Sequence, residues 1–215
     1  MEMTFIAYNL PEKSYNGQSR KYKNISMEMT MSEKNNYLKT YMGKKVDPME
    51  VTPEDITLED IAHALSLICR GNGQVTHFYS VGQHCINCAK EAAARGAGVR
   101  LQLGCLLHDA AEAYMSDLIT PIKIHMPVYY EIEDRFLKAV YEKFGLEDLK
   151  DEEWDYIMEV DRALLAYDLV ELLKEPMPEG GYTVVRTPDI AYRPFAEVES
   201  EYKELALELI SKNKK

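Results

Sequence analysis

Apolar residues recur at helical spacing in six segments between residues 57 and 211, and this periodicity restricts the chain to an all-α fold. Glycine or proline follows most of these segments, as is typical where a helix stops. We therefore expect a helical bundle of about six main helices, with a small β-hairpin around Gly43 near the N-terminus. The expected helices cover residues 57–68, 78–95, 99–114, 127–144, 152–173 and 195–211.

The domain organisation follows from where this periodicity begins. Residues 1–35 are polar and show little periodicity, so we expect a loosely ordered N-terminal extension. A chain of 215 residues suits one main domain, here residues 36–215. Loops are expected at residues 116–127 and 179–194, the second with room for a short strand at residues 182–185.

Charge and composition exclude several classes of protein. With 25 Lys and Arg against 36 Asp and Glu, the net charge is -11, which disfavours nucleic acid or an anionic membrane as partner. A small anionic substrate stays open, because a metal ion can supply positive charge locally. We expect no disulfide framework from the four cysteines, no secretory signal and, since no apolar run reaches about 18 residues, no transmembrane helix. These features predict a cytoplasmic protein.

The segment at residues 152–173 places one charge in an apolar setting. Asp161 lies three or four residues from Ile157 and Leu164 and shares their helix face. A buried carboxylate is costly unless it is paired or bound to a metal, and both interpretations stay open. The apolar face itself is expected to comprise Trp154, Ile157, Met158, Leu164, Leu165, Leu169, Leu172 and Leu173.

Polar residues also interrupt the apolar segment at residues 99–114. His108 and Asp109 follow two leucines. Glu112 lies about one helical turn later, so it shares a helix face with each of them. A lone histidine there is more often a satisfied core residue, but an adjacent His-Asp pair needs two separate partners. With one further histidine from residues 78–95, the candidate metal ligands are His84, His108, Asp109 and Asp161. Mixed imidazole and carboxylate ligands suit a divalent transition metal such as Mn, Co, Fe, Ni or Zn.

The order of these residues, a histidine, then His-Asp, then a distant aspartate, resembles the HD superfamily of metal-dependent phosphohydrolases. The run LLHDAAEAYMSDLITPIK at residues 106–123 is similar to a segment of the bacterial 5′-deoxynucleotidases of that superfamily. The likeness extends over residues 56–173, more than half of the chain. It implies an HD-domain helical bundle with the four ligands named above.

The resemblance also implies roles for four other residues. Glu112 would orient or deprotonate the attacking water, or protonate the leaving oxygen, and Asp117 would shape the site and contact the sugar. Arg70 would bind phosphate through its planar guanidinium group. An equal alternative is that Arg70 lies at the end of a helix and complements the helix dipole. Lys123 is a second phosphate-binding candidate, beside the interpretation that it is a solvated loop lysine.

The chain also departs from this family. Gly71 stands where the nucleotidases have an aromatic residue that senses the missing 2′-hydroxyl, so selectivity for deoxyribose is in question. Ala113 after Glu112 disfavours the guanosine-tetraphosphate hydrolases, which carry a Glu-Asp pair. No histidine lies between Asp109 and His125, which disfavours the triphosphohydrolase branch.

The remaining histidines and cysteines have simpler interpretations. His77 is either a supporting group behind the metal ligands or a helix-start residue, and His63 and His125 are expected to be structural or exposed. The pair Cys85 and Cys88 forms a CxxC motif that could bind zinc or act in redox chemistry, but more often such helical cysteines pack as small apolar residues.

Together with this resemblance, the sequence predicts a metal-dependent phosphohydrolase that takes nucleoside 5′-monophosphates to nucleoside and phosphate, and the resemblance alone favours deoxynucleotides. The expected partner is a small phosphate ester, with no nucleic acid and no membrane, and the resemblance to related proteins implies that a homodimer is possible. Two alternatives stay open. One is a nucleoside triphosphate or other phosphomonoester hydrolase on the same scaffold, and the other is a non-catalytic HD domain that binds a nucleotide.

Overall fold

The computed structural model describes residues 37–178, 181 and 183–214, all within one compact unit, Asn36–Lys215. The extension expected at residues 1–35 lies outside the described residues. The elements follow in the order β1 (Leu38–Lys39), β2 (Lys45–Val46), α1 (Leu58–Leu67), η1 (Arg70–Gly73), α2 (Val81–Ala94), α3 (Val99–Leu107), α4 (Glu112–Met115), α5 (Thr120–Lys123), α6 (Pro127–Phe144), α7 (Asp151–Leu173) and α8 (Phe195–Asn213).

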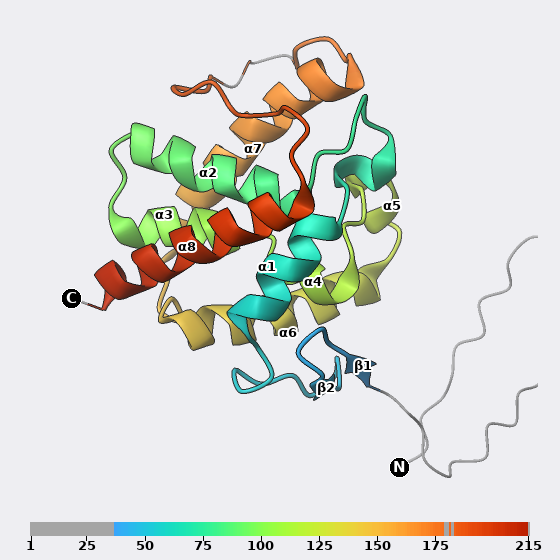
Figure 1. Ribbon diagram of the computed structural model, residues 1–215, viewed down its shortest axis with the longest axis vertical. Coiled ribbons are helices and arrows are strands. Elements are labelled where there is room, and N and C mark those ends of the chain that lie inside the picture. Colours follow the sequence, from blue (N-terminus) through green and yellow to red (C-terminus); the bar gives the residue numbers. More distant parts are fainter. Residues whose placement is uncertain (1–36, 179–180, 182, 215) are drawn as a thin grey trace, which may run out of the picture. The chain divides into compact units, whose positions relative to one another are not determined.

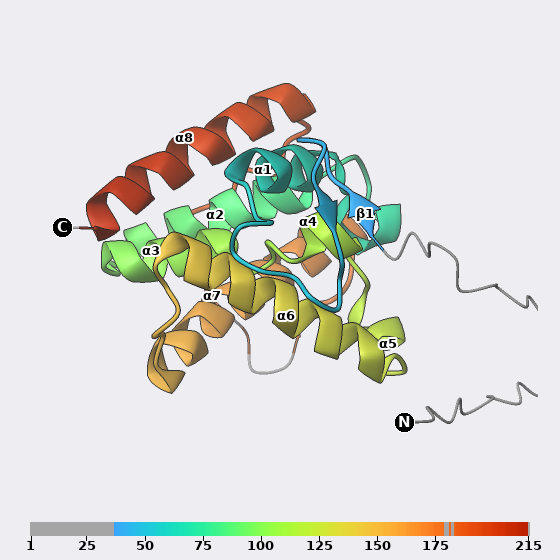
Figure 2. The ribbon, with the colours of Figure 1, turned by 90° about the horizontal axis from the view of Figure 1, so that it is seen from below.

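Helix α2 is the central element of this unit and packs against α1, α3, α7 and α8 (Figure 1). Seen from below, α2 lies between α8 and α7, with α6 and the hairpin on the near side (Figure 2). Its residues are buried without a break from Val81 to Ala89. Gly82 permits the close approach of α1, because a Cβ there would lie 3.2 Å from the backbone of Leu65. Polar side chains between Val81 and Ala89 are therefore held away from water.

The expected all-α fold with a small hairpin is confirmed. The two short strands pair antiparallel, Leu38 with Val46, and Gly43 turns between them with a φ of 80°. Helix α1 begins after Thr57, whose hydroxyl oxygen accepts a hydrogen bond from the backbone N–H of Asp60. None of the helices in the described part of the chain has both the length and the apolarity needed to cross a membrane.

The helix expected at residues 99–114 is wrong in its length, because the chain breaks after α3. The ring of His108 donates through Nδ1 to the carbonyl of Cys105, 2.9 Å away, which the next helical turn would otherwise use. Tighter bonds follow, from Ala110 N–H to Leu107 and from Glu112 N–H to Asp109. Residues 108–111 therefore form turns between α3 and α4.

Other boundaries and placements differ from the expectation as well. Helix α1 ends at Leu67, and the following turn η1 adopts positive φ angles at Gly71 and Asn72, 60° and 54°. The loop expected at residues 116–127 contains the short helix α5, with Pro121 in its first turn. Residues 183–185 form no strand. Leu165, expected on the apolar face of α7, is 37% exposed.

Candidate metal centre

Helix α2 presents His84 to the interior. The helix starts after Ser80, whose side-chain oxygen accepts a hydrogen bond from the N–H of Gln83 at 3.1 Å. His84 falls in the first turn after this cap, and its side chain is fully buried. Cys88 lies one turn further on the same face, with its Sγ 3.4 Å from Nε2 of His84.

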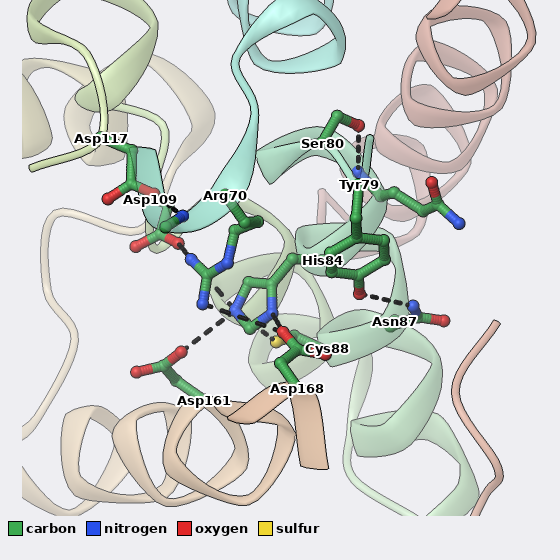
Figure 3. A network of polar contacts seen from close by, with 12 residues as sticks. Arg70, Tyr79, Ser80, His84, Asn87, Cys88, Asp109, Asp117, Asp161 and Asp168 are labelled. Atoms are coloured by element: carbon green, nitrogen blue, oxygen red, sulfur yellow. Dashed lines mark hydrogen bonds and ion pairs between the residues drawn. The ribbon is translucent and has the colours of Figure 1, made fainter. Parts of the chain in front are cut away.

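Four side chains from three parts of the chain meet at this point. Figure 3 shows three of them, those of His84, Asp109 and Asp161. Oδ1 of Asp161, on α7, lies 3.1 Å from Nε2 of His84 and 3.4 Å from Nε2 of His108. Oδ2 of Asp109 lies 3.2 Å from Nε2 of His108 and 4.0 Å from Nε2 of His84. The predicted ligands His84, His108, Asp109 and Asp161 are therefore brought together.

The Nδ1 atoms of His84 and His108 make hydrogen bonds that explain why both Nε2 atoms face this point. Nδ1 of His84 donates to Oδ2 of Asp168 at 3.1 Å, and Nδ1 of His108 donates to the Cys105 carbonyl. In the neutral form of the ring, an acceptor on Nδ1 fixes the tautomer that leaves Nε2 with a lone pair. Such an arrangement, with a carboxylate behind one imidazole, is typical of histidines that bind metals.

Sequence reasoning missed Asp168. It is a buried acidic residue two turns after Asp161 on α7, between leucines of the apolar face. That same anomaly drew attention to Asp161, and it could have identified Asp168 too. One of its oxygens, Oδ1, is buried with no hydrogen-bond partner among the described residues.

The electrostatics of the cluster favour charged groups despite its burial. Burial alone would lower the pKa of His108, but the carboxylate of Asp109 raises it well above the usual range, with Asp161 acting in the same sense. Burial would raise the pKa of Asp109, yet His108 and Arg70 lower it to about 2. The pKa of Asp161 lies well below its usual range because both imidazoles face it, again against the effect of burial. The cluster thus attracts positive charge strongly, whether a proton or a cation.

The cluster fits a metal ion on two grounds. Nε2 of His108 is buried and makes no hydrogen bond within the described part of the chain, although two carboxylate oxygens are near it. Atoms bound about 2.0 to 2.3 Å from one ion lie roughly 3 to 3.6 Å apart when adjacent and about 4 Å apart when opposite. The separations of 3.1, 3.2, 3.4 and 4.0 Å agree with this. The buried cluster could hold a metal ion.

Arg70 projects into the same cluster from the turn η1 (Figure 3). Its Nη1 donates to Oδ2 of Asp109 at 3.2 Å, and its Nη2 lies 4.0 Å from Oδ2 of Asp168. The backbone N–H of Gly71 donates to Oδ2 of Asp117 at 3.2 Å. Asp117 therefore holds the turn that carries Arg70, a role the sequence did not indicate.

The other two candidates occupy different settings. Glu112 is buried in the first turn of α4, and its Oε2 has no hydrogen-bond partner among the described residues. Burial raises its pKa well above the usual range, and the charges of Asp109 and Asp117 add to the effect. Lys123 donates to Glu133 on α6 and lies over the rings of Tyr129 and Tyr130, so its described contacts are outside the cluster.

The remaining histidines and cysteines are also placed. His77 donates through Nε2 to the carbonyl of Ile190 at 2.6 Å, so it anchors the segment before α8. His63 stacks on Tyr41 and pairs with Glu199, and His125 is exposed. All cysteines are free thiols, and Cys85, Cys88 and Cys105 are buried.

No family model matches this chain. The chain is similar to an uncharacterized protein of Rhodobacter capsulatus, at 44% identity over 110 residues, which are 48% of this chain and 56% of that protein. It is also similar to the uncharacterized protein YfdR of Escherichia coli K12, at 37% identity over 110 residues, 51% of this chain and 59% of YfdR. The match thus spans little more than half the length of either curated relative, and neither relative's name states an activity.

Proposed function

We propose that this protein is a metal-dependent phosphohydrolase acting on nucleoside or deoxynucleoside 5′-monophosphates. The observation that carries the proposal is the meeting of two imidazole Nε2 atoms with Oδ1 of Asp161, 3.1 and 3.4 Å away, in a buried cluster. The order of these residues along the chain, which resembles the HD phosphohydrolases, supports the choice of reaction. The ligands in this proposal are His84, His108, Asp109 and Asp161.

A divalent transition metal held there, one of Mn, Co, Fe, Ni or Zn, would polarise a phosphoryl oxygen and lower the pKa of a bound water. Asp168 and the Cys105 carbonyl hold the two imidazoles in the orientation that this requires. The chain supplies the rest of the chemistry through residues around the cluster.

Arg70 steadies the charge of the phosphate in this proposal. Its guanidinium has five donors, of which Nη1 is bound to Asp109 and Nη2 is near Asp168, so donors stay available for phosphate oxygens. Asp117 positions Arg70 through Gly71, and its second oxygen can accept a hydrogen bond from a sugar hydroxyl. Gly71 offers no aromatic surface against the ribose, so we expect weak discrimination between ribose and deoxyribose.

Glu112 donates the proton to the leaving group in this proposal. Its raised pKa favours the protonated carboxyl, and Oε2 is buried with no described partner, so it can donate to the departing 5′ oxygen. Water attacks phosphorus, the bond from phosphorus to the 5′ oxygen breaks, and that oxygen takes the proton. The carboxylate then accepts a proton from water before the next turnover.

A metal-supplemented hydrolysis screen over nucleoside mono-, di- and triphosphates tests this function. We expect inorganic phosphate from monophosphates with Mn²⁺ or Co²⁺, and a loss of at least about 100-fold in kcat for Glu112→Ala. Release of pyrophosphate or triphosphate would indicate the triphosphate hydrolase instead. Nucleotide binding without hydrolysis of any ester would indicate a non-catalytic domain.

A further inference from the structure

Cys88 lies among the candidate metal ligands, although the HD-type pattern gives it no role. Its thiol is fully buried on α2, one turn after His84. Its Sγ and one ligand atom each of His84, His108 and Asp161 all lie within 4.8 Å of one another. Asp109 is not a member of this group, and its Oδ2 already accepts from Arg70.

The thiol also packs among apolar side chains, beside Cys105, Ile157 and Leu164, as a small buried residue would. Packing alone does not explain the unpartnered Nε2 of His108, which is buried in the same group. That atom is an independent sign of a missing partner, because buried ring nitrogens are ordinarily hydrogen-bonded.

The distance from Sγ to Nε2 of His84, 3.4 Å, is compatible with a shared metal ion. With metal–sulfur and metal–nitrogen bonds of about 2.3 and 2.0 Å, adjacent ligands lie roughly 3 to 3.6 Å apart. The i, i+4 spacing on one helix supplies this separation without any movement of the backbone.

We propose that Cys88 is a sulfur ligand of the metal centre, and that it makes the centre select zinc, cobalt or ferrous iron over manganese and magnesium. Thiolate and imidazole ligands favour the softer divalent ions, whereas carboxylate and water favour the harder ones. When the ion binds, the S–H bond breaks, a sulfur–metal bond forms and the proton passes to water, with no change of oxidation state. This inference rests on the metal centre of the proposed function but not on its phosphatase activity.

Cobalt absorption of the intact, metal-free protein titrated with Co²⁺ alone tests the inference. Visible d–d bands report that cobalt is bound, and a near-ultraviolet thiolate-to-cobalt charge-transfer band reports a sulfur ligand. We expect both in the wild-type protein. Visible bands without the charge-transfer band would overturn the role of Cys88 and leave the proposed centre intact. The absence of both would overturn the centre as well.

Variants identify the sulfur. Cys88→Ser should keep the visible bands and lose the charge-transfer band, and its affinity for Zn²⁺ should fall about tenfold or more relative to its affinity for Mn²⁺. Cys85→Ser is the matched control on the same helix, since Cys85 lies near His108 and Asp109, and Cys69→Ser is a control outside both groups. A charge-transfer band that Cys85→Ser removes and Cys88→Ser keeps would contradict the assignment. The wild-type spectrum decides the question even if Cys88→Ser does not fold.

Discussion

Two polar stripes run along helix α2, offset by one residue, and they differ in how their polar groups are satisfied. The metal stripe consists of His84 and Cys88. The clamp stripe has one residue per turn that binds the backbone of residues 183–191, namely Gln83, Asn87, Glu91 and Arg95. Most residues of α2 are buried, although Lys90 is partly exposed and Ala93 and Ala94 are exposed.

The clamp stripe is satisfied by the chain itself. Glu91 accepts from the N–H groups of Val185 and Arg186, 2.8 and 2.9 Å away. Asn87 both donates to and accepts from the backbone of Asp189. In the metal stripe, by contrast, Nε2 of His84 faces the carboxylates of Asp161 and Asp109, 3.1 and 4.0 Å away. Buried polar groups that pair with the backbone stabilise the fold, whereas imidazoles and carboxylates that converge around the unpartnered Nε2 of His108 could hold an ion.

Removing the first residue of the metal stripe should have the largest effect. His84→Ala takes away one of the converging Nε2 atoms, and we expect metal affinity to fall by more than about 100-fold, since even residues behind a ligand change affinity by 10- to 100-fold. Competition with a chelator, followed by metal analysis of the protein, measures the loss. Asn87→Ala on the same helix should keep its metal, and circular dichroism of both variants controls for folding. Unchanged metal content in the His84→Ala variant would refute the proposed metal centre.

Substitution of Asp168, which accepts a hydrogen bond from His84, should weaken metal binding less than substitution of His84 itself. Asp168→Asn keeps an oxygen that can accept from Nδ1 of His84 but removes the charge, so we expect about tenfold weaker metal binding. Asp168→Ala removes the acceptor too, and about 100-fold weaker binding is expected. Isothermal titration with Zn²⁺ compares them. Equal affinity in both variants and the wild type would show that Asp168 does not orient His84.

The clamp stripe should respond in stability rather than in metal binding. Glu91→Gln replaces a carboxylate that accepts two backbone N–H bonds and pairs with Arg95, and we expect a loss of about 1 to 3 kcal/mol in the free energy of unfolding. Urea unfolding of the metal-free protein measures it. A metal affinity that falls in parallel would contradict the separation of the two stripes.

The same variant has a pH dependence with a definite sign. Burial would raise the pKa of Glu91, but the N–H groups of Val185 and Arg186 together with Arg95 lower it below the usual 4.5. A group whose pKa is lowered in the folded state contributes stability above its unfolded pKa and loses that contribution as pH falls through its folded value. The stability difference between wild type and Glu91→Gln should therefore be full at neutral pH and shrink below about pH 4.5. A difference that grows on acidification would reverse the assignment.

These stripes also show how far the sequence alone can lead. Helical periodicity predicted the main helices, and Pro127 and Gly145 marked both ends of α6. His84, His108 and Asp161 stood out because they interrupt apolar faces. Asp168 could have been found by that same reasoning. The break after α3 could not have been predicted in this way, because it depends on a hydrogen bond from the ring of His108 to the carbonyl of Cys105.

Helical periodicity could not predict the contacts of the clamp stripe, for a different reason. Its partner, residues 183–191, is an irregular segment without a repeating pattern, and its contacts with α2 join residues about 100 positions apart. Gln83 and Glu91 resemble ordinary exposed helix residues until that segment covers them. A four-residue spacing of polar residues on a central helix is the one signal that the sequence offered.

Gln83 provides the finest comparison, since it belongs to the clamp stripe and directly precedes His84. Its Nε2 donates to the carbonyls of Asp189 and Ala191, each 2.9 Å away. Because Asp189 and Ala191 are exposed, their carbonyls can turn to water once the amide is gone, so Gln83→Ala should cost only about 1 kcal/mol. Hydrogen exchange should show faster exchange at residues 183–191. Zinc affinity should change by less than about twofold, because the ring of His84 is held by Asp168 rather than by its neighbour in sequence. If zinc binding weakens as the segment loosens, the two stripes act as one unit, and residues 183–191 belong to the support of the metal centre.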